Sequence, residues 1–160
     1  MKGPGDNTLA LFRVYRALVG ASFWLPVFFL FFSEHLALAE VLRLEAVYYG
    51  AVVLLEVPSG AFSDRVGRAA TLRIAAGLGT AGFALFAFGP RTFLGLGAAQ
   101  ALWAGAYACL SGTDSAWLYD HLRSRGRAGA FAEEQGRVTR DAFRAQAAAT
   151  LLGGVAGTFA

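Results

Sequence analysis

The sequence is poor in charged residues and nearly free of cysteine. Only 16% of its 160 residues are charged, whereas ordinary soluble domains are roughly one quarter charged. The single Cys109 excludes an internal disulfide and a cysteine metal cluster. A net charge of +3 is too small to indicate a nucleic-acid partner. Few charges, 14% aromatic and 56% hydrophobic residues exclude a disordered chain and indicate a membrane protein.

Long apolar stretches are the main evidence for the fold class. A helix needs about 17 to 25 mostly apolar residues to cross a bilayer. Five stretches approach or meet that length, at 9–33, 46–63, 74–90, 92–117 and 145–160. A soluble all-α domain would need amphipathic helices to cover them, and the one long polar segment is 120–144. We therefore expect an all-α membrane protein, a polytopic helical bundle of five spans.

The two ends of the sequence raise separate questions. Arg13, Arg16 and the apolar residues after them are also compatible with a signal peptide cleaved near 37–39. That apolar stretch is longer than the roughly 7 to 15 residues of a signal peptide, and further spans follow it. The sequence stops inside the stretch 145–160 with no flanking charge, so we expect a fragment of a longer protein.

Basic residues alternate between the two sides of the predicted spans. Arg43 and Arg91 fall on one side. The other side has the remaining twelve, Lys2, Arg13, Arg16, Arg65, Arg68, Arg73, Arg123, Arg125, Arg127, Arg137, Arg140 and Arg144. Because cytoplasmic loops are enriched in Lys and Arg, we expect the N-terminus and the loops after the second and fourth spans to be cytoplasmic. The sequence has thirteen arginines and one lysine, which indicates the genome of a GC-rich bacterium. Together with the predicted spans, this leads us to expect an integral protein of the bacterial inner membrane.

The most informative segment is the end of the second predicted span and the loop after it. Gly60 and Asp64 are four residues apart and so share one helix face. Gly60 allows another helix to approach closely, and Gly67 permits a tight turn. Arg65 and Arg68 place positive charge at the membrane surface. A plain short loop with cytoplasmic arginines is the alternative interpretation.

This segment resembles the loop signature of the major facilitator superfamily, roughly G-x-x-x-D-R-x-G-R-[RK], between spans two and three. Five residues match it, Gly60, Asp64, Arg65, Gly67 and Arg68. Ala69 departs from it, since a second basic residue usually stands there. The resemblance implies two six-helix halves around a central site, with this chain supplying the first five spans. It also implies that Asp64 engages a helix of the opposite half and helps to close the cytoplasmic side.

Glu56 is a candidate for proton or substrate coupling, because it lies inside the second apolar stretch. Pro58, two residues later, removes a backbone hydrogen bond and bends a helix, which can open a polar cavity beside the acid. Desolvation there favours the protonated carboxyl group that a proton-coupled carrier requires. The alternative is a structural hydrogen bond, for example to Arg13, Arg16 or Tyr49.

Asp114 is the second candidate for coupling, because it follows 22 uncharged residues. An acid at membrane depth is costly unless it is paired, hydrated or protonated. The sequence around it, S-G-T-D-S-A-W-L-Y-D, resembles the end of span four in a branch of uncharacterised bacterial facilitators. The alternative is a solvated acid at a helix end, paired with Arg123 or Arg125.

Small residues and one proline predict the packing and shape of the helices. Glycines are dense in the third and fourth stretches, and Gly153 and Gly157 repeat that pattern in the fifth. Such residues let helix backbones approach closely. Pro26 lies midway along the first stretch, where it is expected to kink the helix.

Motifs for other chemistries are absent from the sequence. There is no P-loop for ATP, and the fifth stretch lacks the proline of the antiporter signature found in some facilitators. His35 and His121 are isolated, so no metal site and no cofactor are expected. Tyr119–Asp120 is similar to half of an intramembrane aspartyl protease site, but the matching G-x-G-D is missing.

The sequence therefore predicts a non-enzymatic secondary transporter. It would move a small solute or drug by alternating access, coupled to a proton or another ion. The expected partners are the lipid bilayer, a small-molecule substrate, the coupling ion and the missing C-terminal half of the same chain. An intramembrane enzyme and a non-transporting membrane scaffold remain the alternatives.

Overall fold

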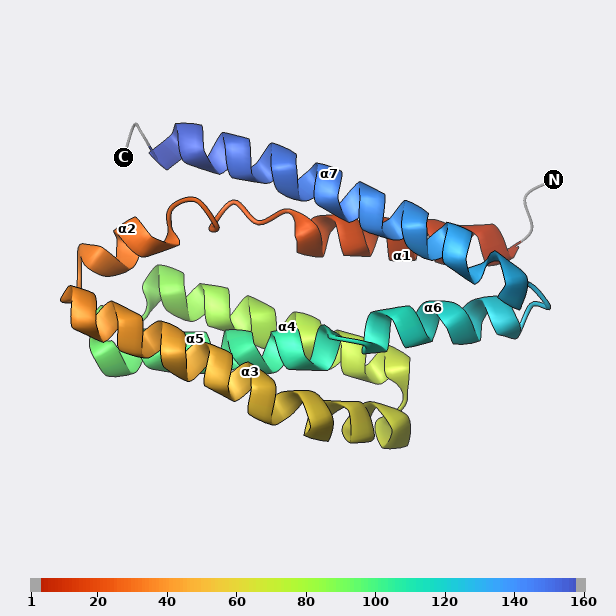
Figure 1. The fold of residues 1–160 in the computed structure, drawn as a ribbon, viewed down its shortest axis with the longest axis horizontal. Helices are drawn as coiled ribbons and strands as arrows, with labels where there is room; N and C mark the ends of the chain where they lie inside the picture. The colour runs from red at the N-terminus through yellow and green to blue at the C-terminus, as the bar shows by residue number, and fades with distance from the viewer. Residues whose placement is uncertain (1–3, 158–160) are drawn as a thin grey trace. The chain divides into compact units, whose positions relative to one another are not determined.

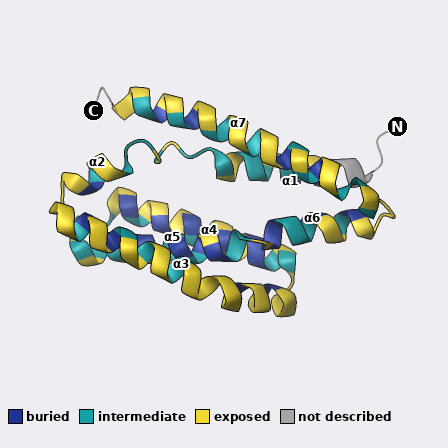
Figure 2. Cartoon of the chain, viewed as in Figure 1, coloured by how far each residue is buried: buried dark blue, intermediate teal, exposed yellow. Residues whose placement is uncertain are grey.

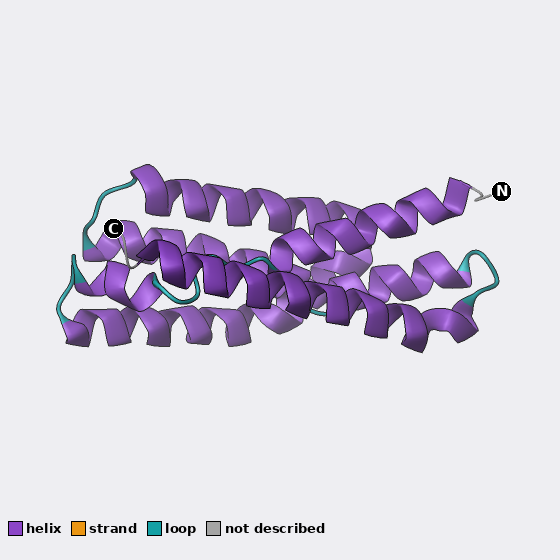
Figure 3. Ribbon diagram, turned by 90° about the horizontal axis from the view of Figure 1, so that it is seen from above, coloured by secondary structure: helices purple, strands orange, loops and turns teal. Residues whose placement is uncertain are grey.

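The computed structural model of the chain describes residues 4–157, and every regular element in that range is a helix (Figures 1 and 3). The all-α prediction is therefore confirmed for the described chain. The helices are α1 (Pro4–Gly20), α2 (Phe28–Ser33), α3 (Leu38–Val66), α4 (Arg68–Phe88), α5 (Phe93–Leu110), α6 (Thr113–Arg123), the short 3-10 helix η1 (Ala128–Ala130) and α7 (Phe131–Gly157).

These helices form two compact units. Residues 32–126 form one unit, which contains α3 to α6. Described residues 4–31 and 127–157 form the other, in which α1 packs against α7.

Two of the helical segments can cross a membrane by length and composition, Arg68–Phe88 and Phe93–Arg123, the second taking α5 and α6 together. Only 33% of the most apolar window of each is buried inside the structure. A core helix of a soluble protein would be mostly buried, so these exposed apolar surfaces favour association with a membrane. The other three expected spans stay predictions.

Two expected spans differ from continuous helices. In the stretch 9–33, α1 ends at Gly20 and the chain is not helical again until Phe28. Pro26 explains part of this break, because proline removes a helical donor and disfavours helix in the residue before it. In the stretch 92–117, the break falls at Gly112, whose φ of 74° is a left-handed conformation that glycine adopts readily. The break separates α5 from α6.

The remaining expected spans fall mostly within long helices. The stretch 46–63 lies within α3, which runs through Pro58, and 74–90 overlaps α4. The stretch 145–160 forms the C-terminal part of α7 up to Gly157, and its last three residues lie outside the described range. The part of the arginine-rich segment from Phe131 onward is helical as well, because it belongs to α7.

In the unit of α3 to α6, α5 packs against both α3 and α4. Thr92 begins α5 as its N-cap, because its hydroxyl accepts the Gly95 N–H at 3.3 Å. Across the α4–α5 contact, a Cβ at Gly82 would lie 3.2 Å from the Ala99 carbonyl oxygen. A Cβ at Gly79 would lie 3.3 Å from the Trp103 ring. The predicted close packing of small residues is confirmed at these two glycines.

In the unit of α1 and α7, glycines of both helices sit against the opposite backbone. A Cβ at Gly20 would lie 2.9 Å from the Ala142 carbonyl oxygen, and one at Gly153 would lie 2.3 Å from the Phe23 carbonyl oxygen. The same unit buries Glu134, which is 3% exposed and ion-paired with Arg13. Because an unpaired acid at such a site is strongly destabilising, this pair ties α1 to α7.

Candidate functional site

The C-terminal half of α3 is mostly exposed, and its buried residues are Ser59 and Ser63 (Figure 2). Both serines face the end of α5 and the start of α6. The Ser59 hydroxyl donates to the Ala108 carbonyl oxygen at 2.8 Å, and the Thr113 hydroxyl donates to the Ser63 hydroxyl oxygen at 3.2 Å. This half of α3 is therefore held to its neighbour by hydroxyl groups. We call Glu56, Ser59, Ser63, Ser111 and Thr113 the inner seam.

Glu56 is an exposed member of the inner seam. Its Oε1 accepts a hydrogen bond from the Ser111 hydroxyl at 3.0 Å. The structural alternative gave Arg13, Arg16 and Tyr49 as examples of a hydrogen-bonding partner, and the partner seen within the unit of α3 to α6 is the hydroxyl of Ser111. A hydroxyl carries no charge of its own, so it leaves the charge of the Glu56 carboxylate uncompensated.

Asp114 lies in the first turn of α6 and is 8% exposed. Its Oδ1 accepts the backbone N–H of Ser115 at 2.7 Å. An acid in the first turn of a helix is stabilised by the helix dipole. Arg123 ends the same helix, so the suggested partner lies at the opposite end of α6. Asp114 and Glu56 flank Ser111 and Thr113, and the structure thus brings the two coupling candidates to one region.

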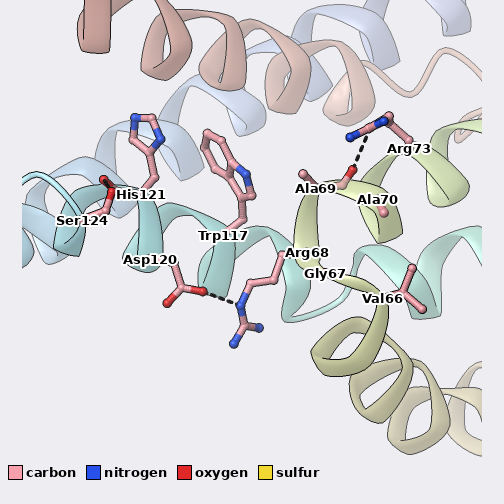
Figure 4. Close-up of a pocket in the computed structure, with 10 residues that line it drawn as sticks. All are labelled: Val66, Gly67, Arg68, Ala69, Ala70, Arg73, Trp117, Asp120, His121 and Ser124. Carbon is pink, nitrogen blue, oxygen red and sulfur yellow. Dashed lines mark hydrogen bonds and ion pairs between the residues drawn. The ribbon is translucent and has the colours of Figure 1, made fainter.

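The turn between α3 and α4 contains most of the loop signature. Gly67 adopts a φ of 97°, which confirms the predicted tight turn at a position that disfavours other residues. Arg68 starts α4, and its Nε donates to the Asp120 Oδ2 at 2.6 Å (Figure 4). Its Nη2 lies 3.4 Å from the Asp64 Oδ1. Arg68 thus joins the loop to α6.

Two members of the signature make weaker connections. A Cβ placed at Gly60 would meet nothing within 4 Å. Within the unit of α3 to α6 nothing approaches Gly60 closely, and the expected approach of another helix stays a prediction. Arg65 lies exposed in the last turn of α3, where its charge complements the helix dipole.

A shallow pocket of about 490 Å³ lies between the start of α4 and α6. Figure 4 shows Arg68 meeting Asp120 on one side and Trp117 with His121 on the other. The Trp117 and His121 rings are stacked, with centroids 4.8 Å apart. Arg73 also lines the pocket, and its Nε donates to the Ala69 carbonyl oxygen at 3.3 Å. The pocket combines an exposed ion pair with aromatic surface, which suits a contact that opens and closes.

Sequence reasoning missed one polar pair in the same unit. The amide of Gln100 donates to the Glu45 Oε1 at 2.8 Å, although Gln100 is only 5% exposed. The available signal was Gln100 itself, because it is a strongly polar side chain inside an otherwise apolar uncharged stretch. Such a residue needs a hydrogen-bonding partner when it is buried.

No protein-family model, no curated protein and no solved structure matches the chain. The resemblance to the major facilitator superfamily therefore rests on the residues of the loop signature and of the segment 111–120 alone.

Proposed function

We propose that this chain belongs to a secondary transporter of the major facilitator type, which moves a small solute or drug by alternating access. In this proposal the chain is an integral part of a bacterial inner membrane, with its N-terminus in the cytoplasm. It contributes a polytopic bundle of five spans, and the rest of the protein contributes the sixth helix of this half and the opposite half. The two membrane-length helical segments and the one-sided arginines support this assignment.

The ion pair between Arg68 and Asp120 is the observation that carries the proposal. It joins two segments that the sequence singled out independently, the loop signature and the end of the fourth stretch. Asp64 and Asp120 side chains are 68% and 54% exposed, and the Arg68 side chain is 31% exposed. Exposed ion pairs contribute about 0 to 1 kcal/mol each. The network can therefore form and break at little cost in every transport cycle.

The proposed gate is the α3–α4 turn, and the inner seam connects it to the coupling acids. When Arg68 releases Asp120, the end of α6 is free to separate from the turn. Asp64 then offers its carboxylate to the opposite half. In this proposal Glu56 and Asp114 take the coupling proton or ion. Glu56 accepts a hydrogen bond from the Ser111 hydroxyl, and Asp114 follows Thr113, whose hydroxyl donates to Ser63 on α3.

Proteoliposomes test the proposal. The intact protein is reconstituted with a pH-sensitive dye inside, and solutes are screened for uptake or release that moves protons. Asp64→Asn and Arg68→Gln are expected to lower the initial rate at least tenfold while leaving insertion and abundance intact. Arg73→Gln is the matched control, because Arg73 lines the same pocket but bonds a backbone carbonyl of its own helix.

The double variant with Arg68→Asp and Asp120→Arg restores opposite charges at this pair. It should recover part of the initial transport rate that each of these two substitutions loses alone. Near-normal rates in Asp64→Asn would remove the gate from the mechanism. Absence of flux for every solute tested, whether followed by the dye or by labelled solute, would refute transport itself.

A further inference from the structure

One face of α7 carries two arginines followed by apolar residues. Its members are Arg140, Arg144, Ala148, Leu151 and Val155, each three or four residues after the one before. Residues at this spacing are neighbours on the surface of a helix. All five are exposed in the structure, where exposed positions recur along α7 (Figure 2). We call these five residues the outer stripe.

The contacts of α7 with α1 use other residues. The buried residues of α7 are Glu134, Val138, Ala149 and Gly153. Glu134 pairs with Arg13 of α1, and Gly153 lies against the carbonyl of Phe23. None of the buried residues of α7 belongs to the outer stripe. Within the unit of α1 and α7, the outer stripe is therefore a surface that these contacts leave open.

Positive charge exceeds negative charge along this part of α7. Residues 137–157 include three arginines and one acid, Asp141. The Asp141 Oδ1 accepts a hydrogen bond from the Arg140 Nε at 3.1 Å. The Arg144 Nη1 lies 3.9 Å from the same oxygen, which is too far for a hydrogen bond, and the Arg144 side chain is 73% exposed. One carboxylate thus serves two guanidinium groups, which leaves an excess of positive charge and of N–H donors.

The change from charged to apolar residues along the outer stripe matches the layers of a bilayer. A helix rises about 1.5 Å per residue, so Arg140 and Arg144 are about 6 Å apart along the axis. The headgroup layer on each side of a bilayer is roughly 5 to 8 Å deep. From Arg144 to Gly157 the helix rises about 20 Å and has no further charge. The two arginines can lie at headgroup depth while Leu151 and Val155 face acyl chains.

The chemistry of the outer stripe fits a phosphate that is attached to an apolar chain. Guanidinium groups bind phosphate oxygens through paired hydrogen bonds. A free anion would be held on this open helix face by charge alone. The acyl chains of a lipid add contacts with Leu151 and Val155, which are 72% and 58% exposed. A zwitterionic headgroup brings a cation of its own, which the excess positive charge disfavours, whereas an anionic headgroup complements it.

We propose that the outer stripe binds an anionic phospholipid. Its phosphate lies at Arg140 and Arg144, and its acyl chains run along Ala148, Leu151 and Val155. The proposal rests on the membrane location in the proposed function and does not depend on transport.

Site-specific photocrosslinking tests the proposal. The intact protein carries benzoylphenylalanine in place of Ala148, one turn beyond Arg144, in vesicles of equal parts phosphatidylglycerol and phosphatidylcholine. Mass spectrometry of the crosslinked lipid gives the ratio of the two lipids, and we expect at least a threefold excess of phosphatidylglycerol. The same probe in place of Ala84 is the positional control, because Ala84 is exposed on α4 and residues 74–90 are uncharged. The ratio there should equal that of the vesicles.

Charge variants identify the source of the excess. Arg140→Gln combined with Arg144→Gln should bring the ratio down to that of the vesicles. Arg123→Gln combined with Arg125→Gln is the matched control, because it removes two exposed arginines from the other unit, and it should keep the threefold excess. Asp141→Asn should raise the excess, since Arg140 loses a competing carboxylate. This single variant also serves if the double variant does not insert.

The outcomes separate this surface from the membrane location itself. Capture of both lipids at the vesicle ratio, or an excess that persists without Arg140 and Arg144, would overturn the lipid surface and leave the membrane location standing. Crosslinks from position 148 to protein would mean that another helix covers the outer stripe, and would overturn the surface as well. Absence of lipid crosslinks at both Ala148 and Ala84 would refute the membrane location.

Discussion

Gly153 offers the sharpest test of the packing of α7 against the segment that follows α1. The Cβ of an alanine at this position would lie 2.3 Å from the carbonyl oxygen of Phe23 and 3.1 Å from its carbonyl carbon. Carbon and oxygen ordinarily approach to about 3.3 to 3.6 Å in such contacts. The two backbones would therefore have to separate by about 1 Å. Gly153→Ala should lower the free energy of unfolding, since overpacking typically costs about 1 to 3 kcal/mol.

The neighbouring Gly154 provides the control. A Cβ there would lie 3.9 Å from the Cβ of Pro26, which is ordinary contact. Removing a helical glycine stabilises a helix by up to about 1 kcal/mol, and this gain applies to both variants. Gly154→Ala should therefore melt at or above the wild-type temperature, and Gly153→Ala below it.

The measurement is thermal unfolding of the intact protein followed by tryptophan fluorescence. Trp24 lies in the non-helical segment next to Phe23 and contributes to the emission together with Trp103 and Trp117. If the two alanine variants melt at the same temperature, the close approach of α7 to the Phe23 carbonyl is refuted.

Three further outcomes are expected. Glu56→Gln should abolish active accumulation and preserve passive exchange of substrate in proteoliposomes, and an unchanged pH profile with full accumulation would exclude Glu56 from coupling. In a cysteine-free background, a cysteine at Val66 should be protected from an impermeant reagent in intact cells and one at Arg91 should react; the reverse pattern would invert the proposed topology. Thr113→Val should lower the free energy of unfolding by about 1 to 3 kcal/mol, because the buried Ser63 hydroxyl loses its partner; a melting temperature equal to that of the wild type would contradict this contact.

The sequence predicted local structure correctly where a backbone conformation requires one type of residue. Gly67 is the clear case, because a tight turn between two long helices requires a residue that tolerates positive φ. The helical content also followed from long apolar stretches. The break before Phe28 was expected only as a kink at Pro26, since hydropathy measures composition and carries no information on backbone hydrogen bonding.

Pairings between helices were harder to predict. Several polar residues could have been the hydrogen-bonding partner of Glu56, and composition does not decide among them. Ser111 is the partner because of the register in which α3 packs on α5. Arg68 and Asp120 were each singled out, but 52 residues separate them in sequence. The hydrogen bond of Gln100 was not predicted for a related reason. Its partner Glu45 lies on another helix and outside the expected span.

The register between α3 and α5 also bears on how the chain is made. The hydrogen-bonded pairs Glu45–Gln100 and Glu56–Ser111 are each separated by 55 residues, so neither acid has this partner when α3 leaves the ribosome. At about 5 to 20 residues per second, the wait is roughly 3 to 11 s. If the chain is a membrane protein as proposed, α4 is inserted during that time, and both carboxylates face lipid, water or the insertion machinery. Synthesis that stalls before Gln100 would leave both acids on α3 without these hydrogen bonds.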